Sequence, residues 1–260
     1  MRFARELTAN LIAAAVAATM ALAAQTCGAA PLKVLSAGAC ERFVTMIAAE
    51  FERQSGRPVS VEADTTGRLV QRINAGEGFD VALLTPAGLE RVVPRFIAGP
   101  AVELARAGIG VAVRTNAPRP DIGSVEAFKR SLRQARSVAY VDPAAGGTSG
   151  IYFSRLLDRL GIADSVRPKA VLVPGGAVAQ RVAAGDAEIG IQMMSELLGV
   201  KGVTLVGPLP APIQTYTVYS GVIGAYASDQ AAAHALLDLM SDVRASGALK
   251  AAGLERTSRR

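Results

Sequence analysis

Three loops of this chain combine small residues with hydroxyl groups, a composition suited to holding an anion. They are residues 36–39 (Ser-Ala-Gly-Ala), 64–67 (Asp-Thr-Thr-Gly) and 146–150 (Gly-Gly-Thr-Ser-Gly). Each loop follows a short apolar stretch and precedes an amphipathic one, so we expect each to lie at the N-terminus of a helix. The unpaired backbone N–H groups and the dipole of a helix favour negative charge at that end. Several such ends facing one cleft would bind a small anion.

Strands and helices that alternate along the chain are expected to position these loops. Apolar residues recur at helical spacing from Cys40 to Phe51, and Gly56 and Pro58 end that helix. The other expected strands are residues 33–35, 59–63, 81–84, 109–113, 137–141, 170–173, 189–192 and 216–226, and the other expected helices are 68–75, 89–97, 151–160, 178–184 and 230–246. Alternating elements of these lengths predict an α/β fold with parallel sheets.

Residues 1–30 have the three parts of a secretory signal peptide. Arg2 and Arg5 give a basic start, an apolar run follows, and small residues suited to signal peptidase close the segment. The apolar run of about 14 residues is shorter than the ~20 residues of a membrane-spanning helix. A lipid anchor on Cys27 is disfavoured, because the three residues before it match the lipid-attachment pattern poorly. Cleavage near residue 29 or 30 would leave Cys40 as the single cysteine of a periplasmic protein without an internal disulfide.

Composition excludes several classes of function. The net charge is +6, but the basic residues are scattered and only 5% of residues are aromatic, which argues against nucleic-acid binding. A mild positive field still favours an anionic ligand. The single histidine, His234, lies in the expected last helix far from the loops, and metal ligands do not cluster in the sequence. No Ser-His or Cys-His pair, metal or cofactor is therefore expected.

Four short pieces, in this order and spacing, resemble the molybdate-binding-protein-like family of periplasmic solute receptors. They are residues 36–39, 65–69 (Thr-Thr-Gly-Arg-Leu), 80–84 (Asp-Val-Ala-Leu-Leu) and 149–152 (Ser-Gly-Ile-Tyr), and the resemblance extends from about residue 33 to 253. It implies a type II periplasmic binding protein fold, with two lobes of parallel or mixed sheets, helices around them and the ligand between the lobes. By this resemblance, residues 31–108 and 217–260 form the first lobe and residues 112–212 the second. It also implies a monomer that delivers a small anion to an ABC permease of the inner membrane.

The resemblance assigns the ligand contacts of the family to positions in this chain, and at two of these positions the side-chain donor is missing. The serine of the first loop corresponds to Ala39, and a tyrosine of the family corresponds to Met193. The serine of the second loop corresponds to Thr66, and backbone N–H contacts fall at Ser149 and Gly175. With their neighbours, the candidate ligand-binding residues are Ser36, Gly38, Ala39, Thr65, Thr66, Gly67, Arg68, Thr148, Ser149, Gly175, Gln192 and Met193.

The two missing donors favour a small organic acid over molybdate. A hydrogen bond to a charged group is worth about 1.5–3 kcal/mol, so losing two weakens the affinity for an oxyanion by about a hundredfold or more. Arg68 adds a guanidinium that pairs with a carboxylate through two N–H groups, and the Gln192 amide adds a donor and an acceptor. Each residue also has a purely structural interpretation. Thr65 and Thr66 would cap a helix, Arg68 would be a solvated surface charge, and Met193 would be a packing residue.

An enzymatic alternative remains open, because periplasmic aconitate isomerase is similar in scaffold to this family. Moving a proton across an allylic tricarboxylate requires an anion cradle and one general base. Asp64, Glu41 and a deprotonated Cys40 are the candidates for that base, and the sequence singles out none of them. The first expectation is therefore a solute-binding protein of an ABC transporter, with an organic carboxylate or an oxyanion such as molybdate as ligand. The alternative is an aconitate isomerase-like enzyme.

Overall fold

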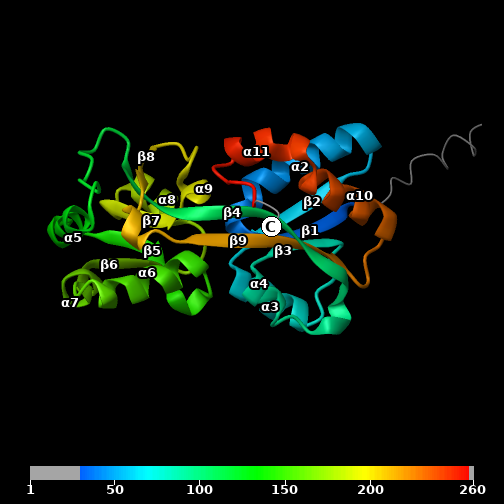
Figure 1. Ribbon diagram of the computed structural model, residues 1–260, viewed down its shortest axis with the longest axis horizontal. Coiled ribbons are helices and arrows are strands. Elements are labelled where there is room, and N and C mark those ends of the chain that lie inside the picture. The colour runs from blue at the N-terminus through cyan, green and yellow to red at the C-terminus, as the bar shows by residue number, and fades with distance from the viewer. Residues whose placement is uncertain (1–29, 258–260) are drawn as a thin grey trace, which may run out of the picture. The chain divides into compact units, whose positions relative to one another are not determined.

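The computed structural model describes residues 30–257, which form a mixed β-sheet with helices on its faces (Figure 1). The expected signal peptide, residues 1–30, lies outside the described residues except for Ala30. The strands are β1 (Leu32–Ala37), β2 (Val59–Asp64), β3 (Val81–Leu84), β4 (Ile97–Arg114), β5 (Val138–Val141), β6 (Ala170–Val173), β7 (Ile189–Met193), β8 (Val203–Pro208) and β9 (Tyr216–Gly224). Their order is β2-β1-β3-β9-β4-β7-β5-β6, and β8 pairs with β4. The α/β fold expected from the sequence is confirmed, with mixed rather than purely parallel pairing.

The long strands β4 and β9 connect two groups of strands. They pair antiparallel with each other, from Ile97 opposite Gly224 to Gly108 opposite Tyr216. One group contains β1, β2 and β3, where β1 is parallel to both neighbours. The other contains β5, β6 and β7 in parallel, with β7 and β8 antiparallel to the far end of β4. The two crossover strands that the resemblance implies would be β4 and β9, and the lobe limits at residues 108, 112, 212 and 217 stay a prediction.

Helices cover both faces of the first strand group. Strand β1 shows why: Val34 packs with Phe43 on one face, while Leu35 packs with Leu69 and Ile73 on the other. Helices α2 (Glu41–Ser55), α10 (Gln230–Ser241) and α11 (Ser246–Ala251) therefore lie on one side of β1–β3, and α3 (Thr66–Asn74) and α4 (Pro86–Leu89) on the opposite side (Figure 1). The other α-helices of the described residues are α5 (Val125–Gln134), α6 (Thr148–Arg159), α7 (Ala163–Val166), α8 (Val178–Ala184) and α9 (Met194–Leu197).

Two expected helices are wrong in part. The helix expected at 89–97 shares only Leu89 with the one-turn helix α4; Pro94–Phe96 form a 3-10 turn, and Ile97 already pairs with Gly224 in the sheet. Proline lacks the N–H that a continuing helix needs, so an α-helix does not run through Pro94. The last expected helix stops at Ser241, where the Asp242 carboxylate accepts the Arg244 backbone N–H at 2.7 Å and begins a new turn. Strand β8 was not predicted.

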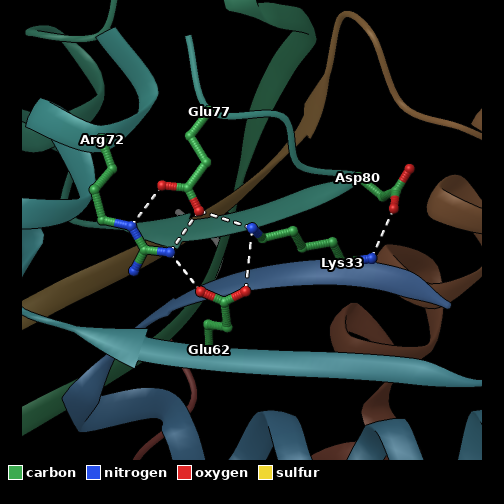
Figure 2. Close-up of polar contacts among 5 residues, drawn as sticks. All are labelled: Lys33, Glu62, Arg72, Glu77 and Asp80. Atoms are coloured by element: carbon green, nitrogen blue, oxygen red, sulfur yellow. Dashed lines mark hydrogen bonds and ion pairs between the residues drawn. The ribbon is translucent and has the colours of Figure 1, made fainter. Parts of the chain in front are cut away.

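A network of charged side chains fixes α3 against β1 and β2 (Figure 2). Lys33 Nζ lies 2.7 Å from Glu77 Oε1 and 3.1 Å from Glu62 Oε1, and Arg72 pairs with both carboxylates. The hydrogen bond from Arg72 holds the pKa of Glu77 at about 2. Buried Asp80 accepts the backbone N–H of Lys33 at 2.6 Å. These contacts hold the helix whose N-terminus carries the second small-residue loop.

Within residues 30–257, no helix has both the length and the apolar character that crossing a bilayer requires.

Candidate functional site

A cavity of about 660 Å³ lies where the loops after β1, β2, β5 and β7 meet. This volume is typical of small-molecule sites, which span about 300–1,000 Å³. Both strand groups contribute to it, and β9 contributes the buried Tyr219. Ligands of α/β proteins commonly bind at the carboxyl ends of the strands, as this arrangement allows.

Six of the twelve predicted site residues line the cavity. They are Gly38, Ala39, Thr65, Thr66, Thr148 and Ser149. Thr66 and Ser149 are buried and belong to the first turns of α3 and α6, whose N–H groups and dipoles favour an anion. No side chain caps α6, which leaves its first N–H groups available to a ligand. A Cβ at Gly150 would lie 2.0 Å from the Val141 carbonyl oxygen, so glycine is required for this approach of α6 to β5.

The second and third loops are in direct contact. The Thr65 hydroxyl accepts the Arg68 backbone N–H at 3.3 Å, which caps α3, and it donates to the Ala145 carbonyl at 2.5 Å. The Gly67 N–H donates to the Gly146 carbonyl at 3.3 Å. A Cβ at Gly67 would lie only 2.8 Å from the Gly146 Cα, so both positions require glycine. Thr65 therefore has the capping role named as its structural interpretation.

The other six predicted residues do not line the cavity. Arg68 is exposed, while the buried Ser36 hydroxyl donates to the Ala37 carbonyl at 3.0 Å. Met193 is 1% exposed and belongs to the main hydrophobic core. The remaining three are Gly67, in the contact above, Gly175, which precedes the lining residue Gly176, and the buried Gln192. Roles for these residues in ligand binding stay predictions.

Glu196, which the sequence analysis missed, lines the cavity from α9. Gln192 Nε2 donates to Glu196 Oε1 at 2.8 Å and to the Gly176 carbonyl at 3.0 Å. A Cβ at Gly38 would lie 2.9 Å from Glu196 Oε1, so glycine at that position leaves room for the carboxyl group. Burial raises the pKa of Glu196 to about 8, with a smaller contribution from the charge of Glu41. Glu196 can therefore exchange a proton near neutral pH.

The three expected general bases differ in their surroundings. Cys40 is fully buried, and burial raises the pKa of its thiol far above the ordinary range. The thiolate that catalysis would need is thus disfavoured. Asp64 and Glu41 both line the cavity, but Asp64 Oδ1 accepts the Thr65 backbone N–H at 2.7 Å. Glu41 is exposed at the start of α2.

Two further polar residues, Ser195 and Arg42, contribute to the walls of this site. The Ser195 hydroxyl is buried without a hydrogen-bond partner within the described residues, and Ser195 lines the cavity. Arg42 lines the cavity as well, and its Nη1 donates to the Leu198 carbonyl at 3.3 Å. In the part of the chain that the structure describes, no three His, Cys, Asp or Glu side chains gather as a metal site requires. The arrangement offers helix N-termini, hydroxyls, one cation and one proton-exchanging carboxyl group.

Comparison with known proteins agrees with this architecture. A family model described as bacterial extracellular solute-binding protein matches residues 32–255. Aconitate isomerase of a Pseudomonas species is 35% identical, covering 97% of each chain. Molybdate-binding protein ModA of Azotobacter vinelandii is 30% identical, covering 94% of this chain and 96% of ModA. The solved structure of the periplasmic molybdate-binding protein of Azotobacter vinelandii has a TM-score of 0.74 at 20% identity, covering 88% of this chain and 100% of that one. The expected resemblance is therefore confirmed, and the chain belongs to the ModA-like bacterial extracellular solute-binding proteins.

Proposed function

We propose that this protein binds a small unsaturated tricarboxylate in the cavity and isomerises it by moving a proton, as an aconitate isomerase does. The observation that carries the proposal is Glu196, a carboxyl group with a pKa of about 8 in the wall of an anion site. An anion site is sufficient for a receptor, whereas isomerisation also requires a proton-exchanging group beside the bound ligand. The 35% identity to the Pseudomonas aconitate isomerase supports the same conclusion.

The reaction requires a single base. The ionised Glu196 takes a proton from the CH₂ carbon next to the double bond, and that C–H electron pair becomes the new double bond. The electrons of the old double bond take up the same proton at the far carbon, and Glu196 is ionised again. Atoms and electrons balance without a co-reactant. Negative charge that develops on the substrate carboxylates would be stabilised by the uncapped N–H groups at the start of α6 and by the dipoles of α3 and α6.

The site chemistry disfavours a bare oxyanion. Ala39, which lines the cavity, lacks the hydroxyl donor that the resemblance to molybdate receptors implies at this position. A tricarboxylate has carbon atoms to place beside Glu196, with its carboxylates at the helix starts. Its size also suits the cavity of about 660 Å³.

Transport is the second candidate function. The observation that favours it is membership of the solute-binding family, with ModA among the relatives. The protein would then be a periplasmic monomer, exported by the signal peptide of residues 1–30, that presents a small anion to an ABC permease. The same cavity would hold the ligand, and Glu196 would act only as a hydrogen-bonding group.

The test is interconversion of cis- and trans-aconitate by the purified protein. Glu196→Gln keeps the size of the side chain and its contact with Gln192, so binding measured by calorimetry should persist. The isomerisation rate of Glu196→Gln should fall by roughly 10²–10⁴-fold, which is the contribution of a general base. The wild-type kcat/KM should rise with pH up to about 8 and then level off, because the base must be ionised.

Two further variants sharpen this test. Glu103→Gln makes the same change on β4 at an exposed residue outside the cavity, and should leave the rate unchanged. Glu41→Gln tests the rival base at the cavity wall. Loss of activity in Glu41→Gln with retention in Glu196→Gln would reject the assignment. A wild type that binds aconitate without interconverting it would leave transport as the function.

A further inference from the structure

We propose that Arg42 determines specificity, pairing with one carboxylate of the ligand and selecting tricarboxylates over dicarboxylates. This inference rests on the proposed function, since it assigns the substrate class of the same cavity.

The guanidinium of Arg42 reaches across the cavity. Arg42 is the second residue of α2 and lines the cavity beside Thr45 of the next turn. Its Nη1 donates to the carbonyl of Leu198, the residue that follows α9 in the other strand group. Gly199 comes next, and a Cβ there would lie 2.2 Å from Nη1, so the guanidinium lies directly against this glycine. The cation thus lies against the loop that follows Glu196.

Arg42 is the cation among mostly acidic charged residues in the cavity wall. Among the described residues that line the cavity, Arg42 is the only lysine or arginine, whereas Glu41, Asp64 and Glu196 are acidic. A tricarboxylate adds three negative charges, and the two helix N-termini of α3 and α6 offset roughly half a charge each. Arg42 therefore supplies the one full positive side-chain charge among these lining residues, and it reduces the excess of negative charge around the bound ligand.

Arg42 also has donors left for a ligand. A guanidinium has five N–H donors, and the contact with Leu198 is the hydrogen bond that the structure gives Arg42 within residues 30–257. Arg42 is in none of the ion pairs of the described residues. Its remaining N–H groups suit a two-point contact with a carboxylate. A ligand carboxylate would thereby join α2 to the loop after α9.

The experiment compares two saturated acids that cannot isomerise, tricarballylate and glutarate, which differ by one carboxylate. Calorimetry on wild type and Arg42→Gln should show tricarballylate affinity falling by about tenfold or more, the effect of one charged hydrogen-bonded contact. Glutarate affinity should fall by less than about threefold, as expected for a distant, screened charge. Arg42→Lys keeps the charge without the planar guanidinium, so its tricarballylate affinity should lie between those of wild type and Arg42→Gln.

Arg53→Gln is the matched control, because Arg53 is an exposed arginine of the same helix, α2, and lies outside the cavity. It should change neither affinity. Equal losses for the two acids in Arg42→Gln, or no loss, would overturn the role of Arg42 while leaving the proposed function intact. A wild type that binds neither acid nor aconitate would overturn the proposed function itself. Thermal unfolding of each variant confirms that the affinities are measured on folded protein.

Discussion

The stability of this protein should fall as pH rises through neutrality, because Glu196 is held in a site that disfavours its charge. Its pKa is about 8 in the folded protein, against an ordinary value of 4.5. The folded state therefore binds more protons than the unfolded state between these two values, and stability decreases across that window. The full difference corresponds to about 5 kcal/mol, of which about 4 kcal/mol falls between pH 5 and pH 9.

Glu196→Gln isolates this contribution. The amide cannot ionise, so its advantage over wild type in unfolding free energy should grow by about 4 kcal/mol from pH 5 to pH 9. Urea denaturation of both proteins at matched pH and ionic strength measures it, and comparing the two proteins cancels every group they share. Parallel curves across this range would refute the claim that the carboxyl group is desolvated. Such a result would also remove the main support for Glu196 as a general base.

Two other variants test the loop and the ion-pair network. Thr65→Ala should cost about 1–2 kcal/mol of unfolding free energy, because the α3 cap is lost along with the bond to Ala145. Thr66→Ala should instead lower tricarballylate affinity by about tenfold with a smaller stability loss, and calorimetry with urea denaturation separates the two. A larger stability loss for Thr66→Ala would reverse these roles. Glu77→Gln should cost about 1–2 kcal/mol at pH 7 after allowing for solvent screening. That cost should vanish as pH falls from 4.5 toward about 2, since the Glu77 pKa is lowered. A pH-independent cost in acid denaturation would contradict this.

The architecture was predictable because its signals are local. Strand β3 at Val81–Leu84 and helix α8 at Val178–Ala184 have the predicted bounds, since each is a short apolar or periodic segment between glycine, proline or acidic turns. The same local pattern led to Thr66 and Ser149, which both reach the cavity. Arg68 shows the limit of predicting a site residue from its position next to a loop. Leu69, Val70 and Ile73 bury one face of α3, so the helical period itself turns Arg68 toward solvent.

Glu196 and Arg42 depend on contacts between distant segments, which the sequence does not display. Glu196 follows an apolar strand within a four-residue helix, and its pKa is raised because parts of the chain near Gly38 and Gly176 close around it. The side chain of Arg42 lies beside Leu198 only after both strand groups have formed. One local signal for Glu196 was present, since Gln192 and Glu196 are four residues apart and hydrogen-bonded.

The contact between the second and third loops bears on the speed of ligand capture. The bonds from Thr65 to Ala145 and from Gly67 to Gly146 must both break before anything can pass between these loops. At a net value of about 0.5–1.5 kcal/mol each, the parted loops would make up roughly 1–20% of the ligand-free protein. A ligand that enters by this route meets a receptive molecule in only that fraction of encounters, and its observed association rate is reduced in proportion. The Thr65 donor is a side-chain hydroxyl, whereas the Gly67 donor is a backbone N–H. Side-chain substitution can therefore remove the Thr65 bond but not the Gly67 bond, so part of this kinetic barrier belongs to the main chain.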